Sequence, residues 1–113
     1  MDITEIGYFQ FNNLVRGRIP FILVNLGVDL STWYKSVEAM HLANVSVSAD
    51  ENNVVELVQA KKLPPHFAIV VIDQDGSRAK NIVATLEAAG FLNAHHVRGG
   101  LNGLEKEKLE ENL

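Results

Sequence analysis

The most constraining stretch of this sequence is an apolar run that ends abruptly in a short polar loop. Residues 68–72 read Ala-Ile-Val-Val-Ile and contain no polar position. β-branched side chains without alternation are typical of a strand buried on both faces, as in a parallel sheet covered by helices on each side. The next six residues are polar or small, and a helical pattern follows them. The stretch therefore predicts a strand, a tight loop and a helix.

The loop after this strand is the first candidate site. Ligands of open α/β sheets bind beyond the carboxyl ends of the strands. Gly76 can adopt backbone angles that other residues avoid, and Asp75 or Ser77 can cap the helix that follows. The backbone amides of such a turn point into one concavity, which suits a negative charge. We therefore expect residues 73–78 to form an anion cradle.

The loop belongs to a longer pattern. Its residues are Asp73, Gln74, Asp75, Gly76, Ser77 and Arg78. A leucine, a glycine, a phenylalanine and an asparagine follow within residues 86–94, and paired glycines follow within 97–100. This pattern resembles a rhodanese-like domain, most specifically from Ile69 to Leu104 and more loosely over nearly the whole chain. The resemblance implies an α/β sulfurtransferase fold, with a central parallel sheet of about five strands and helices on both faces.

Several positions depart from the family pattern. The family's loop opens with a catalytic cysteine, whereas this chain has Asp73 there and no cysteine anywhere. Asn25 and Gly27 stand where the family usually has a paired aspartate and arginine, and Leu104 stands where it usually has tryptophan. In the family, a persulfide forms on the cysteine and passes its sulfur to an acceptor. A carboxylate holds no transferable sulfur, so we expect a pseudoenzyme with no catalytic residue in the loop.

The function that we expect is a binding or regulatory module. The loop, with the surface around Arg78, Arg98 and Lys80, would recognise a protein partner or a small anion. Trp33 and Tyr34 are a second possible contact surface, although large aromatic side chains at this density are usually core packing. A self-association surface, and thus a homo-oligomer, stays open.

Two enzymatic alternatives remain. In the first, Asp73 acts as the nucleophile of a phosphoryl-transfer enzyme, which would need magnesium, with Asp75 as the nearby ligand. In the second, residues 70–78 are the opening strand and acidic pair of a receiver-like phosphoacceptor domain. That reading lacks a later strand that ends in aspartate, because residues 94–98 contain none.

Composition limits the remaining classes. The 113 residues suit one domain over residues 1–113, and the apolar fraction of 47% is ordinary for a globular protein. A net charge of −4 gives no general attraction to nucleic acid or anionic membranes. No apolar run approaches the roughly 20 residues of a membrane span, and the first residues lack the basic start of a signal peptide. We therefore expect a cytoplasmic protein with no cofactor and no metal.

The rest of the chain predicts further alternating elements. We expect strands at 3–6, 20–27, 45–48 and 94–98, and helices around Phe11 to Val15, around Trp33 to Val37, from Asn53 to the prolines, from the loop to Gly90, and over 104–113. His95 and His96 are adjacent in a predicted strand, so their side chains should point to opposite faces of the sheet. His41 is a loose match to a family histidine.

Overall fold

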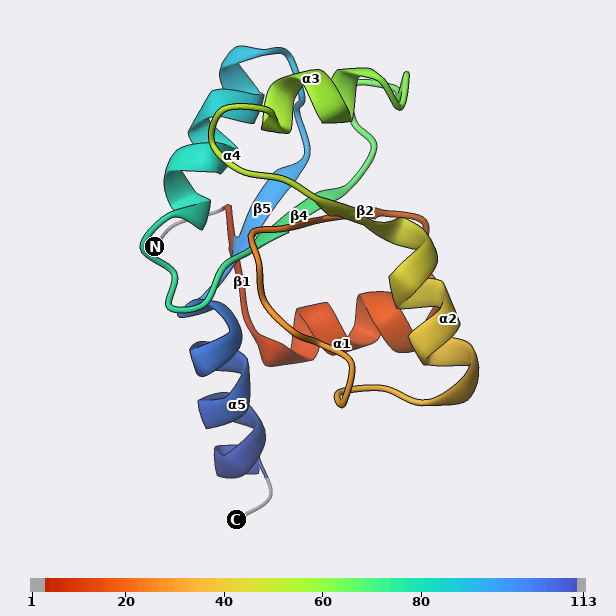
Figure 1. Cartoon of the computed structure of the whole chain (residues 1–113). Coiled ribbons are helices and arrows are strands. Elements are labelled where there is room, and N and C mark those ends of the chain that lie inside the picture. The colour runs from red at the N-terminus through yellow and green to blue at the C-terminus, as the bar shows by residue number, and fades with distance from the viewer. Residues whose placement is uncertain (1–3, 112–113) are drawn as a thin grey trace.

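The computed structural model describes residues 4–111, and in it strands alternate with helices along the chain (Figure 1). The strands are β1 (Glu5–Ile6), β2 (Ile22–Asn25), β3 (Ser46–Ser48), β4 (Ile69–Ile72) and β5 (Ala94–Val97). The helices are α1 (Tyr8–Arg16), α2 (Ser36–Val45), α3 (Val54–Gln59), α4 (Ala79–Ala88) and α5 (Gly100–Glu111). Within this part of the chain, no helix is long and apolar enough to cross a membrane.

All five strands form one parallel sheet in the order β1-β5-β4-β2-β3. The predicted α/β class and the parallel sheet of five strands are therefore confirmed. Strand β4 is the middle strand, and all four of its residues are buried. Its unbroken apolar sequence follows from this position, since a central strand of a doubly covered sheet meets a hydrophobic layer on each face.

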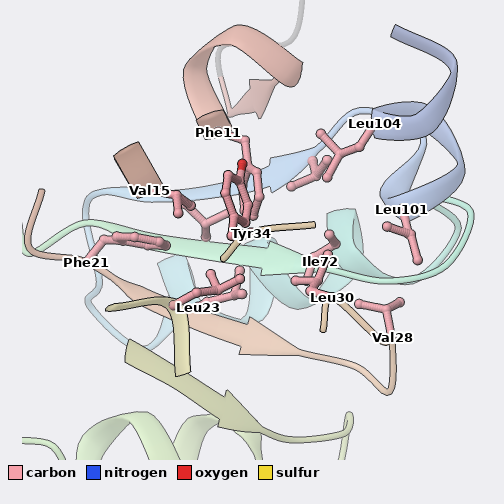
Figure 2. Packing of buried hydrophobic residues seen from close by; sticks show 13 residues of the cluster. Phe11, Val15, Phe21, Leu23, Val28, Leu30, Tyr34, Ile72, Leu101 and Leu104 are labelled. Atoms are coloured by element: carbon pink, nitrogen blue, oxygen red, sulfur yellow. The ribbon is translucent and has the colours of Figure 1, made fainter. Parts of the chain in front are cut away.

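Two hydrophobic layers cover the sheet. In Figure 1, α1, α2 and α5 lie on one side and α3 and α4 on the other. On the first side, Val70 and Ile72 of β4 pack in a cluster with residues of α1 and α5, among them Phe11 and Leu104 (Figure 2). On the second side, Ile69 and Val71 join the cluster that contains the buried residues of α4, which are Ala79, Ile82, Val83 and Leu86. Alternate residues of β4 thus anchor opposite layers.

The helix boundaries follow local signals in most places. The buried face of α4 has helical spacing, and the helix gives way to a turn at Gly90, whose φ of +100° suits glycine. Gly17 closes α1, with its N–H donating to the carbonyl oxygen of Asn13 at 2.9 Å. Strand β1 is described at Glu5–Ile6, while residue 3 of the predicted strand lies outside the described part.

Two predicted helices begin elsewhere. Residues 31–33 form a turn, Tyr34 lies in neither a helix nor a strand, and α2 begins only at Ser36. The polar side chain of Asp29 accepts the N–H of Ser31 at 2.9 Å, which satisfies the backbone in a turn rather than a helix. Helix α5 begins at Gly100, earlier than predicted, and residues 112–113 of its predicted end lie outside the described part.

We predict that the first hydrophobic layer contributes strongly to stability. Leu23 of β2 is fully buried in it, and Leu23→Ala should lower the free energy of unfolding by about 2–5 kcal/mol through lost burial and the remaining cavity. Leu92, which is 73% exposed, provides the matched control, and Leu92→Ala should change stability by less than about 0.5 kcal/mol. Chemical denaturation measures both. Similar losses in the two variants would contradict the assignment of Leu23 to the core.

Candidate functional site

The loop of residues 73–78 follows the middle strand of the sheet directly. Asp73 is the first residue after β4, and its exposed fraction is only 1%. The loop leads straight into α4, which begins at Ala79. Because β4 lies between β2 and β5, the loop sits at the carboxyl edge of the sheet with a neighbouring strand end on each side.

The carboxylate of Asp73 occupies the concavity of its own loop. One oxygen, Oδ1, accepts the backbone N–H of Gly76 at 2.8 Å. The other, Oδ2, accepts the N–H groups of Arg78 at 2.7 Å and Ala79 at 3.1 Å. The side chain therefore closes the loop and caps the first turn of α4, where backbone N–H groups otherwise lack partners. The backbone N–H groups that could bind an external anion therefore already donate to the Asp73 carboxylate.

The other polar side chains of the loop are exposed and are held by neighbours. Gln74 donates from Nε2 to Oδ1 of Asn102 at 2.7 Å. Asp75 accepts both the hydroxyl of Ser77 at 2.6 Å and its N–H at 2.9 Å. These two bonds, the hydroxyl first, hold the pKa of the Asp75 carboxyl below its ordinary value. The outer face of the loop is thus a polar surface whose side chains have defined positions.

Arg78 turns away from the concavity and pairs with Glu51. Its Nη2 donates to Oε2 of Glu51 at 3.0 Å, its Nε donates to Oε1, and its Nη1 lies 3.4 Å from the carbonyl oxygen of Leu26. The hydrogen bonds from Arg78 lower the pKa of Glu51 to about 2 and the pairing raises the pKa of Arg78. Sequence reasoning missed Glu51. It could have been found from its position after β3, because the residues that follow parallel strands lie at the same edge of the sheet as the loop.

The start of α5, at the paired glycines 99–100, is hydrogen-bonded to the loop. The N–H groups of Leu101 and Asn102, in the first turn of α5, donate to the carbonyl oxygens of Asp73 and Gln74 at 2.8 and 3.0 Å. Gly100 has a φ of +61°, and a Cβ atom there would lie 2.3 Å from the carbonyl oxygen of Asp73. Close contact between the two loops therefore requires a residue without a side chain, which explains one of the paired glycines.

Asn25 and Gly27 form a turn beside the loop instead of an ion pair. Oδ1 of Asn25 accepts the N–H groups of Gly27 at 2.9 Å and Val28 at 2.8 Å, and its Nδ2 donates to the carbonyl oxygen of Val28. Gly27 has a φ of +93°. Leu104 is buried in the first hydrophobic layer.

The remaining candidates are dispersed over the fold. Arg98 pairs with Glu5 and with Glu107, at 2.7 and 2.8 Å, so it joins β5 to β1 and α5. Lys80 is exposed on α4. In the part of the chain that the structure describes, no three histidine, cysteine, aspartate or glutamate side chains are grouped so that they could hold a metal ion.

The aromatic and histidine candidates lie away from residues 73–78. Tyr34 is buried and donates its hydroxyl to Oδ1 of Asn12 at 3.0 Å; its burial raises its pKa to about 12. The ring of His41 packs on Phe21, with ring centroids 5.9 Å apart. His95 lines a hollow beside α1, whereas its neighbour His96 pairs in register with Val71. Because Val71 belongs to the second hydrophobic layer, the two histidines point to opposite faces of the sheet.

Comparison with known proteins supports the fold. No family model matches the chain, and no curated protein gives a significant match. A crystal structure of a protein from Lactobacillus plantarum, a structural genomics target, is similar with a TM-score of 0.60 and 15% sequence identity. The match covers 93% of this chain and 84% of that chain. At this identity the two proteins share an architecture, and the likeness carries no statement about activity.

We predict that Asp73 stabilises the fold through its three amide contacts. Asp73→Ala removes the shared acceptor and leaves buried N–H groups without a partner, so unfolding free energy should fall by on the order of 3 kcal/mol. Asp75→Ala is the matched control, because that side chain is exposed and accepts its two hydrogen bonds from Ser77, within the loop. It should cost less than about 1 kcal/mol. Equal losses of unfolding free energy in the two variants, measured by denaturant titration, would show that the Asp73 contacts do not stabilise the fold more than those of Asp75.

A second prediction concerns the contact between the two loops. Gly100→Ala places a Cβ against the Asp73 carbonyl oxygen and forces a left-handed backbone, so it should destabilise the fold by at least about 3 kcal/mol. Gly90→Ala also meets a positive φ but has no atom within 4 Å of the added Cβ. It should cost only about 1 kcal/mol. Thermal unfolding compares them, and a Gly90→Ala loss as large as that of Gly100→Ala would refute the close approach.

Proposed function

We propose that the chain is a rhodanese-like domain without sulfurtransferase chemistry, and that it acts as a binding module whose loop face recognises a partner protein. The observation that carries this proposal is the placement of Asp73. Its carboxylate is 1% exposed and accepts three backbone N–H groups of its own loop. The loop residues thus form a structural unit, and the position of the family's nucleophile is a structural anchor.

The chemistry of Asp73 disfavours an enzymatic role. Sulfur transfer needs a soft, polarisable atom that can leave as a thiolate, and a carboxylate oxygen does not meet that need. A carboxylate nucleophile for phosphoryl transfer would need a lone pair directed at the substrate. Both oxygens of Asp73 are instead directed at backbone N–H groups inside the loop.

The same geometry favours a protein partner over a small anion. A small anion would have to compete with Asp73 for the N–H groups of Gly76, Arg78 and Ala79. It would also meet Glu51 in contact with the Arg78 guanidinium. A partner protein can instead use the outer face, where Gln74, Asp75 and Arg78 are held in place by hydrogen bonds. Side chains that are already ordered lose less conformational entropy when they enter an interface.

The chemical part of the proposal is tested by activity and anion binding. A thiosulfate-to-cyanide sulfur transfer assay on the purified wild type should give no turnover. In an NMR titration with sulfate, the wild type should bind weakly, and Asp73→Ala should bind about tenfold more tightly, which corresponds to about 1.4 kcal/mol. The reason is that the substitution frees the loop N–H groups. Asp75→Ala, which leaves those groups occupied, should bind sulfate as the wild type does.

Two results would overturn this part. Sulfur transfer by the wild type that resists thiol-alkylating reagents would show that the chain performs the chemistry without a cysteine. Tighter sulfate binding by the wild type than by a folded Asp73→Ala would show that the carboxylate does not occupy the anion position. Amide chemical shifts of residues outside the loop establish that the variant is folded.

The recognition part is tested by affinity capture from the native cell. Wild-type bait should retain a partner that Arg78→Glu loses, because the substitution reverses a charge on the loop face and repels Glu51. Lys61→Glu provides the control: Lys61 is exposed in the turn after α3, remote from the loop in sequence. Recovery of the same proteins with all three baits would remove the loop face from the interface.

A further inference from the structure

A series of adjoining hollows lies on the side of the sheet covered by α1, α2 and α5. The first, of about 380 Å³, is lined by residues of α5 and by Thr32 and Trp33. The second, of about 450 Å³, shares Thr32, Trp33 and Lys108 with the first. The third, of about 230 Å³, shares Arg16 and Glu38 with the second. Because neighbours share lining residues, the three form one surface, which we call the basic groove.

The basic groove concentrates positive charge on a chain whose net charge is −4. Its lining includes Arg16, Arg18, Lys35 and Lys108, against two acidic residues, Glu38 and Glu105. Within residues 4–111, Arg16, Arg18 and Lys35 take part in no ion pair. With four cations against two carboxylates, the lining has a net charge of +2, which favours an anionic ligand.

Apolar surface lies between these cations. Trp33 is half-buried and lines the first two hollows, where Lys108 lies 5.0 Å from its ring centroid. At the two ends of the groove, Leu109 is 69% exposed and Val37 is 50% exposed. Tryptophan and arginine are enriched in protein-binding surfaces, and both line this groove.

The backbone at the groove has an unusual conformation. Arg18 has a φ of +51° and Ser36 a φ of +55°, both in the left-handed region that residues other than glycine seldom adopt. Arg18 lines the third hollow and Ser36 the second. Such conformations cost about 1–3 kcal/mol each and are concentrated at binding sites.

We propose that the basic groove binds an extended acidic segment of a partner protein that also carries apolar side chains. Three adjoining hollows suit an extended chain, since each is lined by at least one cation and Trp33 lines two of them. Acidic residues of the segment would pair with Arg16, Lys35 and Lys108, and its apolar residues would contact Trp33 and Leu109. This site is additional to the loop face of the proposed function, because none of residues 73–78 lines it.

The experiment uses the full chain and a fluorescently labelled synthetic peptide of glutamates interrupted by leucines. Anisotropy should show saturable binding that weakens with added salt, because screening shortens the range of exposed charges to about 10 Å at 0.1 M. The indole N–H signal of Trp33, the single tryptophan in the sequence, should shift in NMR spectra as the peptide binds. A peptide with glutamine in place of glutamate should bind at least about tenfold more weakly.

Variants locate the site. Arg16→Gln, Lys35→Gln and Lys108→Gln should each raise the dissociation constant about threefold to tenfold through loss of one charge contact. Lys61→Gln removes an equal charge from the opposite side of the sheet and should leave binding unchanged. Arg78→Ala should also bind the peptide as the wild type does, so failure at the groove and failure at the loop face are distinguishable.

Three results would overturn the proposal. The first is the absence of saturable peptide binding at low salt. The second is an equal loss in Lys61→Gln and in the groove variants, which would indicate a nonspecific charge effect. The third is concentration-dependent dimerisation of the wild type that Lys108→Gln abolishes, because a second copy of the chain would then occupy the groove.

Discussion

The bonds between one buried carboxylate and three backbone N–H groups hold the carboxyl edge of this sheet together. Asp73 connects the end of the middle strand to the beginning of α4 through its side chain. Through its own carbonyl oxygen it also receives the first turn of α5. A strand and two helices on opposite faces of the sheet thus meet at one residue. A buried polar side chain is tolerated in such a place only where hydrogen bonds compensate for lost hydration.

Asp73 also determines which hydrogen-bond donors of the loop remain open to a ligand. The turn needs an acceptor for its N–H groups, and aspartate supplies one permanently, whereas a ligand supplies one only while it is bound. Under the proposed function, the loop gains stability from this internal acceptor at the expense of affinity for external anions. The exposed groups that remain, Arg78 with Glu51 and Gln74 with Asn102, are arranged as pairs that a second surface can contact.

The parts of the fold that could be predicted are those where local sequence and burial agree. Strand β4 was predictable because a run of β-branched residues has no alternative to double burial, and α4 because its apolar spacing ends at Gly90. The turn at Trp33 was mistaken for a helix, since apolar spacing continued through it while Asp29 satisfied the backbone in another way. The Arg78–Glu51 pair and the basic groove were missed because each brings together residues that are far apart in the sequence. No single stretch of the sequence contains a pattern that indicates them.

The edge strand β1 has a consequence for how the chain is made. Its two residues pair with His96 and Val97 of β5. The N–H of Tyr8 that follows β1 donates to the Glu107 carboxylate of α5. Strand β1 and the start of α1 are therefore completed by residues of β5 and α5, which are synthesised long after them. Long-range parallel pairing of this kind closes slowly, so β1 remains without its neighbour in the sheet at least until β5 has been synthesised.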